Sequence, residues 1–152
     1  MADNAQIIWT FLKAQGLNDC GIAGLMGNLY AESGLQPNNL QNTYSKKFGL
    51  SDAEYTKRVD NGRYTNFVND KAGYGLAQWT FWSRKQSLLE YAKAQKTSIG
   101  DLNMQLNFLM KELSQSYPSV LNTLRTASSV LEASNAVLLK FERPADQSAA
   151  VQ

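Results

Sequence analysis

Apolar residues recur every three or four positions in two stretches near the start of the chain. The first stretch covers residues 4 to 15. The second begins after Asn18 or Asp19, which are common helix caps, and ends near Glu32-Ser33-Gly34. Pro37 forbids a longer helix, because its ring removes a backbone donor and clashes with the preceding turn. The spacing therefore predicts two amphipathic helices in this region.

The same spacing returns after Thr80 and predicts four more helices. The predicted ranges are residues 82 to 95, 101 to 115, 118 to 126 and 129 to 142. A proline opens the third of these helices, and Ser129 with Glu132 opens the fourth. Pro144 is expected to end it.

The segment from residue 37 to about 70 lacks a sustained period and is rich in Asn, Tyr, Lys and Ser, which predicts a polar lobe of loops. Within it Ser51 and Glu54 match a capping box, so a short helix is expected over residues 52 to 60. Any β structure is expected in residues 62 to 79. The elements together predict an α+β fold that is mainly helical, with a small loop or β region between helices.

The length of 152 residues suits one domain with one core. We expect this domain over residues 1 to 146, followed by a tail or the start of a linker at residues 147 to 152. Within the second helix Gly21, Gly24 and Gly27 lie three residues apart. Because glycine weakens a helix, this spacing indicates that a neighbouring helix or a ligand approaches closely.

Composition excludes several classes of function. Apolar residues make up 43% of the chain and charged residues 18%, and the net charge of +2 is spread without a basic run, which argues against nucleic-acid binding. No window is long and apolar enough to cross a bilayer, and the polar start lacks the features of a signal peptide. We expect a monomer that is made in a cytoplasm and does not insert into membranes. Cys20 stands alone and can form no internal disulfide.

The chain contains no histidine, and this excludes several kinds of catalytic site. Ser-His-Asp hydrolysis, Cys-His peptidases and His-rich zinc sites all need the imidazole ring. The glycine-rich motifs of nucleotide binding are also missing. Glycoside hydrolysis needs only carboxylic acids, without metal or cofactor, so the 13 Asp and Glu residues point to that reaction class.

The first candidate motif, GNLYAESGLQP, places Glu32 at the C-terminal end of an apolar helix. The helix end carries partial negative charge, and Leu29 and Tyr30 are expected to exclude water. Both effects raise the pKa of a carboxyl group, as a general acid for glycosidic bond cleavage requires. The alternative interpretation is a solvated glutamate at a helix end.

The second candidate motif is AGYGLAQWT, at residues 72 to 80. Gly75 allows a tight turn beside a ligand, and the amide of Gln78 supplies both a donor and an acceptor. Tyr74 and Trp79 are candidates for stacking on sugar faces. The alternative is a buried hairpin or helix start in which Trp79 belongs to the core.

Three segments, GNLYAESGLQPNN, NDKAGYGLAQWTFWSRK and FERPAD, resemble the phage tail lysozyme family, which is akin to goose-type lysozymes and lytic transglycosylases. The resemblance covers residues 5 to 146. It implies a two-lobed lysozyme-like fold with a cleft, and it assigns the catalytic acid to Glu32. It also implies sugar-binding roles for Gly75 and Gln78, and we add Ser33 and Tyr30 as further substrate contacts.

The resemblance leaves the second carboxylate open. Gly73 occupies the position at which hen-type lysozymes carry a nucleophilic Asp. Goose-type enzymes place a water-activating Asp upstream of the corresponding motif, and Asp70 lies one residue short of that spacing. Asp70 is our first candidate for the base, and Asp60 is the second. If neither acts, Glu32 serves as acid and then base, as in a lytic transglycosylase.

The sequence thus predicts a muramidase that cleaves the MurNAc-GlcNAc β-1,4 bond of bacterial peptidoglycan, with inversion if an Asp activates water. It would act on the cell wall as a phage lysin or virion tail component, alone or within a larger chain with a wall-binding domain. A transglycosylase giving 1,6-anhydro products is one alternative. A non-catalytic wall-binding or tail domain is another. Arg84 and Lys85 are expected at the surface.

Overall fold

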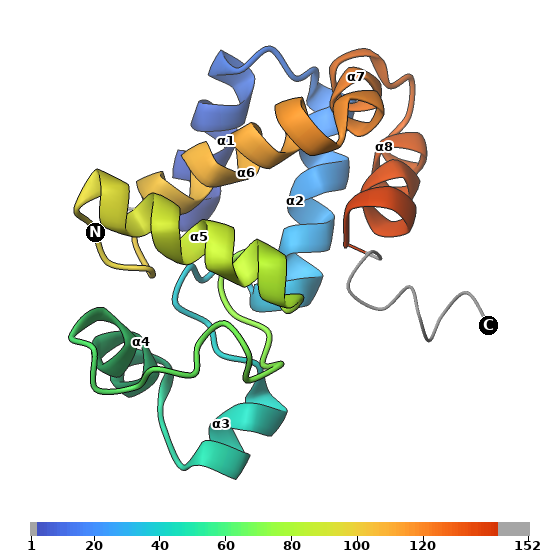
Figure 1. The fold of residues 1–152 in the computed structure, drawn as a ribbon. Coiled ribbons are helices and arrows are strands. Elements are labelled where there is room, and N and C mark those ends of the chain that lie inside the picture. Colours follow the sequence, from blue (N-terminus) through green and yellow to red (C-terminus); the bar gives the residue numbers. More distant parts are fainter. Residues whose placement is uncertain (1–2, 143–152) are drawn as a thin grey trace. The chain divides into compact units, whose positions relative to one another are not determined.

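The computed structural model describes residues 3–142 and is mainly helical, as predicted (Figure 1). In chain order the elements are α1 (Asn4–Ala14), α2 (Asp19–Ser33), α3 (Asn42–Phe48), α4 (Asp52–Asp60), α5 (Trp82–Gln95), α6 (Leu102–Ser116), α7 (Pro118–Thr126), α8 (Val130–Ala136) and the π-helix η1 (Val137–Glu142). Pro144 and the domain boundary expected after residue 146 lie outside the described residues.

Two antiparallel β-bridges, Leu40 with Tyr74 and Tyr74 with Trp79, stand where a small β region was expected. No regular strand is formed in residues 3–142. One bridging partner, Leu40, precedes the range of residues 62 to 79 that the sequence indicated. The α-helical part of the predicted fold class is therefore confirmed, whereas the β part is reduced to isolated bridges.

Contacts divide the chain into two units. The first unit comprises the chain up to Leu35 and from Leu109 onward, and the second unit comprises Gln36–Phe108. Helix α6 begins in the second unit and ends in the first.

Capping residues set most helix boundaries as predicted. The Asn18 side chain accepts a hydrogen bond from Gly21 N at 2.8 Å and opens α2. Ser51 and Glu54 form both bonds of the capping box at the start of α4. These interactions satisfy backbone donors that a helix leaves unpaired in its first turn. The six predicted helices that correspond to α1, α2, α4, α5, α6 and α7 are confirmed to within one or two residues.

Two elements differ from the prediction. The polar lobe contains α3, which the sequence pattern did not indicate, because none of its residues is buried and its N-cap makes no side-chain hydrogen bond. Its end is marked by Gly49 in the left-handed conformation, with a φ of 67°. The helix expected over residues 129 to 142 is α-helical only as far as Ala136 and continues as the π-helix η1.

Helix α2 is the centre of the first unit and contacts α1, α7, α8 and η1 (Figure 1). A Cβ on Gly21 would lie 1.8 Å from the backbone oxygen of Leu124, and one on Gly24 would lie 2.6 Å from the Cβ of Ala133. The glycines at these two positions therefore allow α7 and α8 to approach α2 closely. Gly27 faces open space instead, so its spacing alone does not imply a close neighbour.

We expect the variant Gly21→Ala to lower the free energy of unfolding by about 3 kcal/mol, because the added methyl group overlaps backbone that cannot move without shifting α7. Gly27→Ala is the matched control. It adds the same group where nothing lies within 4 Å, and it should raise stability by about 0.5–1 kcal/mol through its helix propensity. Urea denaturation of both variants measures the difference. Equal stability of the two would contradict the close packing of α2 on α7.

Aromatic rings dominate the core of the second unit. Tyr55 on α4 lies within 5.4–6.4 Å, between ring centroids, of four other rings. These are the rings of Phe48, Tyr64, Phe67 and Tyr74. A cluster of this kind supplies much of the apolar burial that a short polar lobe needs.

Candidate active site

Glu32 is the penultimate residue of α2, so the predicted position at a helix C-terminus is confirmed. Gly34 closes the helix in the left-handed conformation, and its N–H donates to Tyr30 O at 2.8 Å. Glu32 is exposed, and Tyr30 is 68% exposed. Of the two effects expected at this position, the charge of the helix end is therefore present, whereas shielding by burial is not. Ser33 is buried and donates to Leu29 O at 3.0 Å, which favours a structural role for its hydroxyl over a substrate contact.

The second motif forms a tight hairpin in the second unit. Tyr74 and Trp79 exchange two backbone hydrogen bonds, of 3.1 and 2.9 Å, and Gln78 N donates to Gly75 O across the turn at 3.0 Å. Gly75 has a φ of +88°, a value that side chains rarely tolerate. Its N–H donates to Asn39 O at 2.9 Å, which ties the hairpin to the preceding loop.

Gln78 has a strained backbone at the centre of this hairpin. Its φ of 51° is left-handed, which costs a non-glycine residue about 1–2 kcal/mol. The amide nitrogen of Gln78 donates to the backbone oxygens of Asn39 and Gly75 at 2.9 and 3.1 Å. Its Oε1 lies against Gly73, where an added Cβ would come within 2.8 Å. A third bond, to Asn39 Oδ1 at 3.1 Å, means that both N–H groups of this amide are used within the protein, and the side chain is held in one orientation.

Tyr74 and Trp79 lie inside the second unit, and both are 0% exposed. The Tyr74 hydroxyl shares a hydrogen bond of 2.5 Å with Thr56 Oγ1. The Trp79 ring meets Phe108 edge to face at 5.3 Å. Burial of this kind favours the core interpretation of both rings over the sugar stacking that was expected of them.

Asp70 lies in a buried ion pair with Lys85, at 2.6 Å between Oδ1 and Nζ, and the two side chains are 1% and 0% exposed. Its Oδ1 also accepts from Ala72 N at 2.9 Å. Its Oδ2 accepts from the hydroxyls of Tyr55 and Tyr64 at 2.6 and 2.7 Å. Four donors use the acceptor positions of one carboxylate. This geometry favours a structural role for Asp70 over activation of a water molecule.

The expectation that Lys85 lies at the surface is wrong. Its ammonium donates to Ala72 O at 2.7 Å, in addition to Asp70, and lies 4.3 Å from the ring centre of Phe67. Burial lowers the pKa of Lys85 to about 8, and the neighbouring Asp70 carboxylate opposes this change. Burial and the bond to Asp70 raise the pKa of Tyr55. We name Asp70, Lys85, Tyr55 and Tyr64 the ionic core; it attaches the start of the second motif to α4 and α5.

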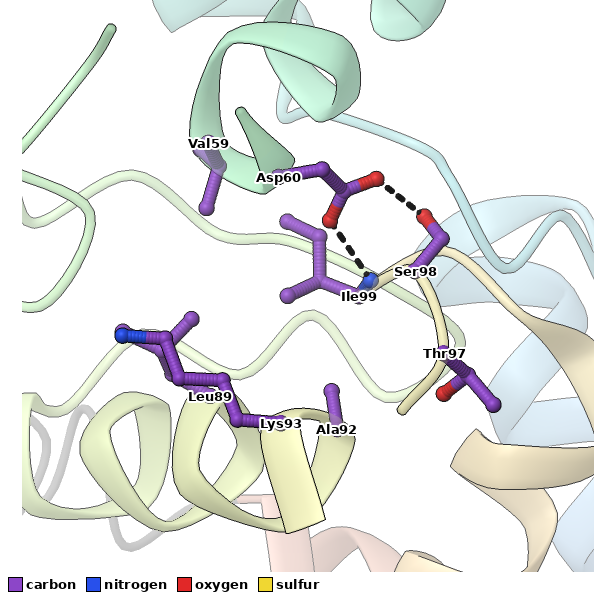
Figure 2. A pocket seen from close by; sticks show the side chains of 8 residues that line it. All are labelled: Val59, Asp60, Leu89, Ala92, Lys93, Thr97, Ser98 and Ile99. Atoms are coloured by element: carbon purple, nitrogen blue, oxygen red, sulfur yellow. Dashed lines mark hydrogen bonds between the residues drawn. The ribbon is translucent and has the colours of Figure 1, made fainter. Parts of the chain in front are cut away.

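Asp60, the second candidate for the base, lies at a pocket of about 220 Å³ within the second unit (Figure 2). The lining residues are Val59, Asp60, Leu89, Ala92, Lys93, Thr97, Ser98 and Ile99. The carboxylate accepts hydrogen bonds from Ser98 Oγ at 2.5 Å and from Ile99 N at 3.0 Å. Both Asp60 oxygens therefore hold the loop that precedes α6 (Figure 2). Gln78 does not line this pocket.

Gln105 is a buried polar residue that the sequence analysis did not single out. Its Oε1 accepts from Leu76 N at 2.9 Å, and its Nε2 donates to the backbone oxygens of Pro37 and Ile99 at 2.6 and 2.7 Å. Three bonds from one amide thus position the turn of the second motif. The signal in the sequence was the position of Gln105, a polar residue between Met104 and Leu106 on an otherwise apolar helix.

An acid at the C-terminal end of α2 and a tight turn that carries Gln78 are the two features that the lysozyme-like motifs predicted, and both are present. A comparison with models of known families matches the phage tail lysozyme model over residues 3–152. This chain belongs to the phage tail lysozyme family. Members are lysozyme-like peptidoglycan hydrolases, and the family fits a phage-related protein that acts on the cell wall. No match was found among curated proteins.

Within residues 3–142, no group of three or more Cys, Asp or Glu side chains is placed to hold a metal ion. None of the helices described for this phage tail lysozyme family member has the length and apolar character needed to cross a bilayer.

Proposed function

We propose that this protein is a muramidase that cleaves the MurNAc-GlcNAc β-1,4 bond, with Glu32 as the general acid. The observation that carries the proposal is the position of Glu32, an exposed residue at the C-terminal end of α2, in a member of a lysozyme family. A helix C-terminus disfavours the carboxylate and therefore favours the protonated form that donates to the bridging oxygen.

The two aspartates that are candidates for the base both make hydrogen bonds that hold the fold together. Asp70 belongs to the ionic core, and Asp60 holds the loop before α6. The hydrolytic route needs a base that activates water on the opposite face of the sugar. A base drawn from Asp70 would have to leave four hydrogen-bond donors, which is costly in a buried site.

This commitment of Asp70 favours a second candidate, the transglycosylase reaction. In that reaction Glu32 protonates the leaving oxygen and then accepts the proton of the sugar's own 6-hydroxyl, which closes a 1,6-anhydro ring. No second carboxylate is needed. Gly75 and Gln78 would bind the sugar in either reaction, because both reactions use the same substrate.

Product analysis tests the proposal and separates the two reactions. Purified peptidoglycan is digested with the protein, and the released muropeptides are analysed by mass spectrometry with and without borohydride reduction. Muramidase products gain two hydrogens on reduction, whereas anhydro products are not reduced. Failure to release any muropeptides from several wall types would contradict both reactions and favour a binding or tail-structural domain.

A further inference from the structure

Two large aromatic side chains are exposed at the start of α5, directly after the second motif. Phe81 is 48% exposed and Trp82 is 53% exposed. Their ring centroids are 6.1 Å apart, and the ring planes are inclined by 36°. The two rings therefore form one continuous apolar surface, which we name the aromatic platform.

Folding does not explain the platform. Phe81 occupies the N-cap of α5 and makes no side-chain cap bond, at a position where Ser, Thr, Asp or Asn is preferred. Neither ring is buried, so neither contributes its full apolar area to the core. Paired exposed rings of this size are typical of binding surfaces.

The platform has a rigid connection to the second motif. Thr80 Oγ1 donates to Gln78 O at 2.9 Å, which holds the two-residue link between the hairpin and α5. The carbonyl of Phe81 accepts from the backbone nitrogens of Arg84 and Lys85, each at 3.0 Å. Lys85 is itself anchored in the ionic core. The backbone that carries both rings is therefore held in place before any ligand binds.

We propose that Phe81 and Trp82 form a sugar-stacking subsite for the glycan strand of peptidoglycan. The inference rests on the proposed function, which supplies the polymer. In β-1,4-linked N-acetylhexosamines the ring substituents are equatorial, so each sugar presents flat faces of C–H groups that pack against aromatic rings. The aromatic platform directly follows the segment that carries Gln78. One glycan strand would therefore contact both the platform and Gln78. Tyr74 and Trp79 are buried, so among the aromatic residues of this segment we assign sugar stacking to the two exposed rings instead.

The test measures binding of the full chain to insoluble, purified peptidoglycan at 4 °C, and separately the kinetics of muropeptide release. We expect Trp82→Ala to weaken binding and raise KM about tenfold, as loss of an aromatic anchor does, with kcat unchanged. Trp82→Phe keeps an aromatic ring, so its affinity for peptidoglycan should fall by about twofold at most. Leu131→Ala is the control, because Leu131 is an apolar residue that is even more exposed, at 69%, and lies in the first unit. It should bind as the wild type does.

The outcomes separate this inference from the proposed function. If the double variant Phe81→Ala/Trp82→Ala binds walls as tightly as the wild type, the platform is not a glycan subsite, whether or not the protein cleaves. If Leu131→Ala weakens binding as much as Trp82→Ala, the effect is general surface adhesion and the inference is overturned. If no variant cleaves but Trp82→Ala still weakens binding, the platform stands and the enzymatic proposal fails.

Discussion

Replacing Glu32 by Gln should lower the rate of muropeptide release by about 10²–10⁴-fold, the usual contribution of a general acid. The amide has nearly the same shape as the carboxyl group, but it cannot give a proton to the bridging oxygen. Because Glu32 is exposed, the substitution should change the free energy of unfolding by no more than about 0.5 kcal/mol. Initial rates on purified walls, with circular dichroism as the measure of folding, provide the two readouts.

Glu90→Gln is the matched control for this loss of activity. Glu90 is exposed on α5 and accepts a hydrogen bond from Gln86 Nε2 at 3.0 Å. The control removes the same charge and leaves the proposed acid intact, so it should retain wild-type activity. An active Glu32→Gln variant would refute the role of Glu32, and an equally inactive Glu90→Gln variant would show that net charge is the cause.

The helix boundaries were predictable because they depend on neighbours along the chain. The Asn18 cap, the capping box of Ser51 with Glu54, and Pro118 at the first position of α7 each act within one turn. The short helix α3 has no such signal at its start and buries none of its residues, so neither pattern nor capping could indicate it.

The site was predictable in part. The motif that contains Gln78 was recognised from its residues, and its glycine does adopt the conformation that a tight turn needs, with a φ of +88° at Gly75. Which aromatic rings face water was not predictable, because burial depends on elements far apart in the sequence. Trp79 is buried and its ring packs edge to face on Phe108, whereas Trp82, three residues later, is exposed.

The ionic core depends on the same long-range information. The spacing of Asp70 from the motif indicated a base, and Lys85 was expected at the surface, where most lysines of folded proteins lie. The roles of both residues depend on the ion pair between them, which neither residue reveals by itself. Lys85 lies three residues before Leu88, on the apolar face of α5. A charged residue on a buried face needs a partner of opposite charge, and this position was the signal in the sequence for such a pair.

Lys85→Met should lower the free energy of unfolding by about 3–5 kcal/mol, because it leaves the Asp70 carboxylate buried without its cation. Methionine fills a similar volume, so the loss of the ion pair, rather than a cavity, is the cause. Urea denaturation measures the change. The variant should also release muropeptides more slowly, since Lys85 Nζ holds Ala72 O at the start of the motif that carries Gln78.

Two comparisons isolate the buried ion pair as the cause. Lys13 forms an ion pair with Asp19 at the surface, where the two side chains are 58% and 69% exposed. Lys13→Met breaks this pair and should lower the free energy of unfolding by no more than about 1 kcal/mol. The double variant Lys85→Met/Asp70→Asn removes both charges, so no uncompensated charge stays buried. Its loss in free energy of unfolding should therefore be smaller than the sum of the losses of the two single variants. Additive losses in the double variant, or equal losses for Lys85→Met and Lys13→Met, would contradict the view that burial makes this pair essential.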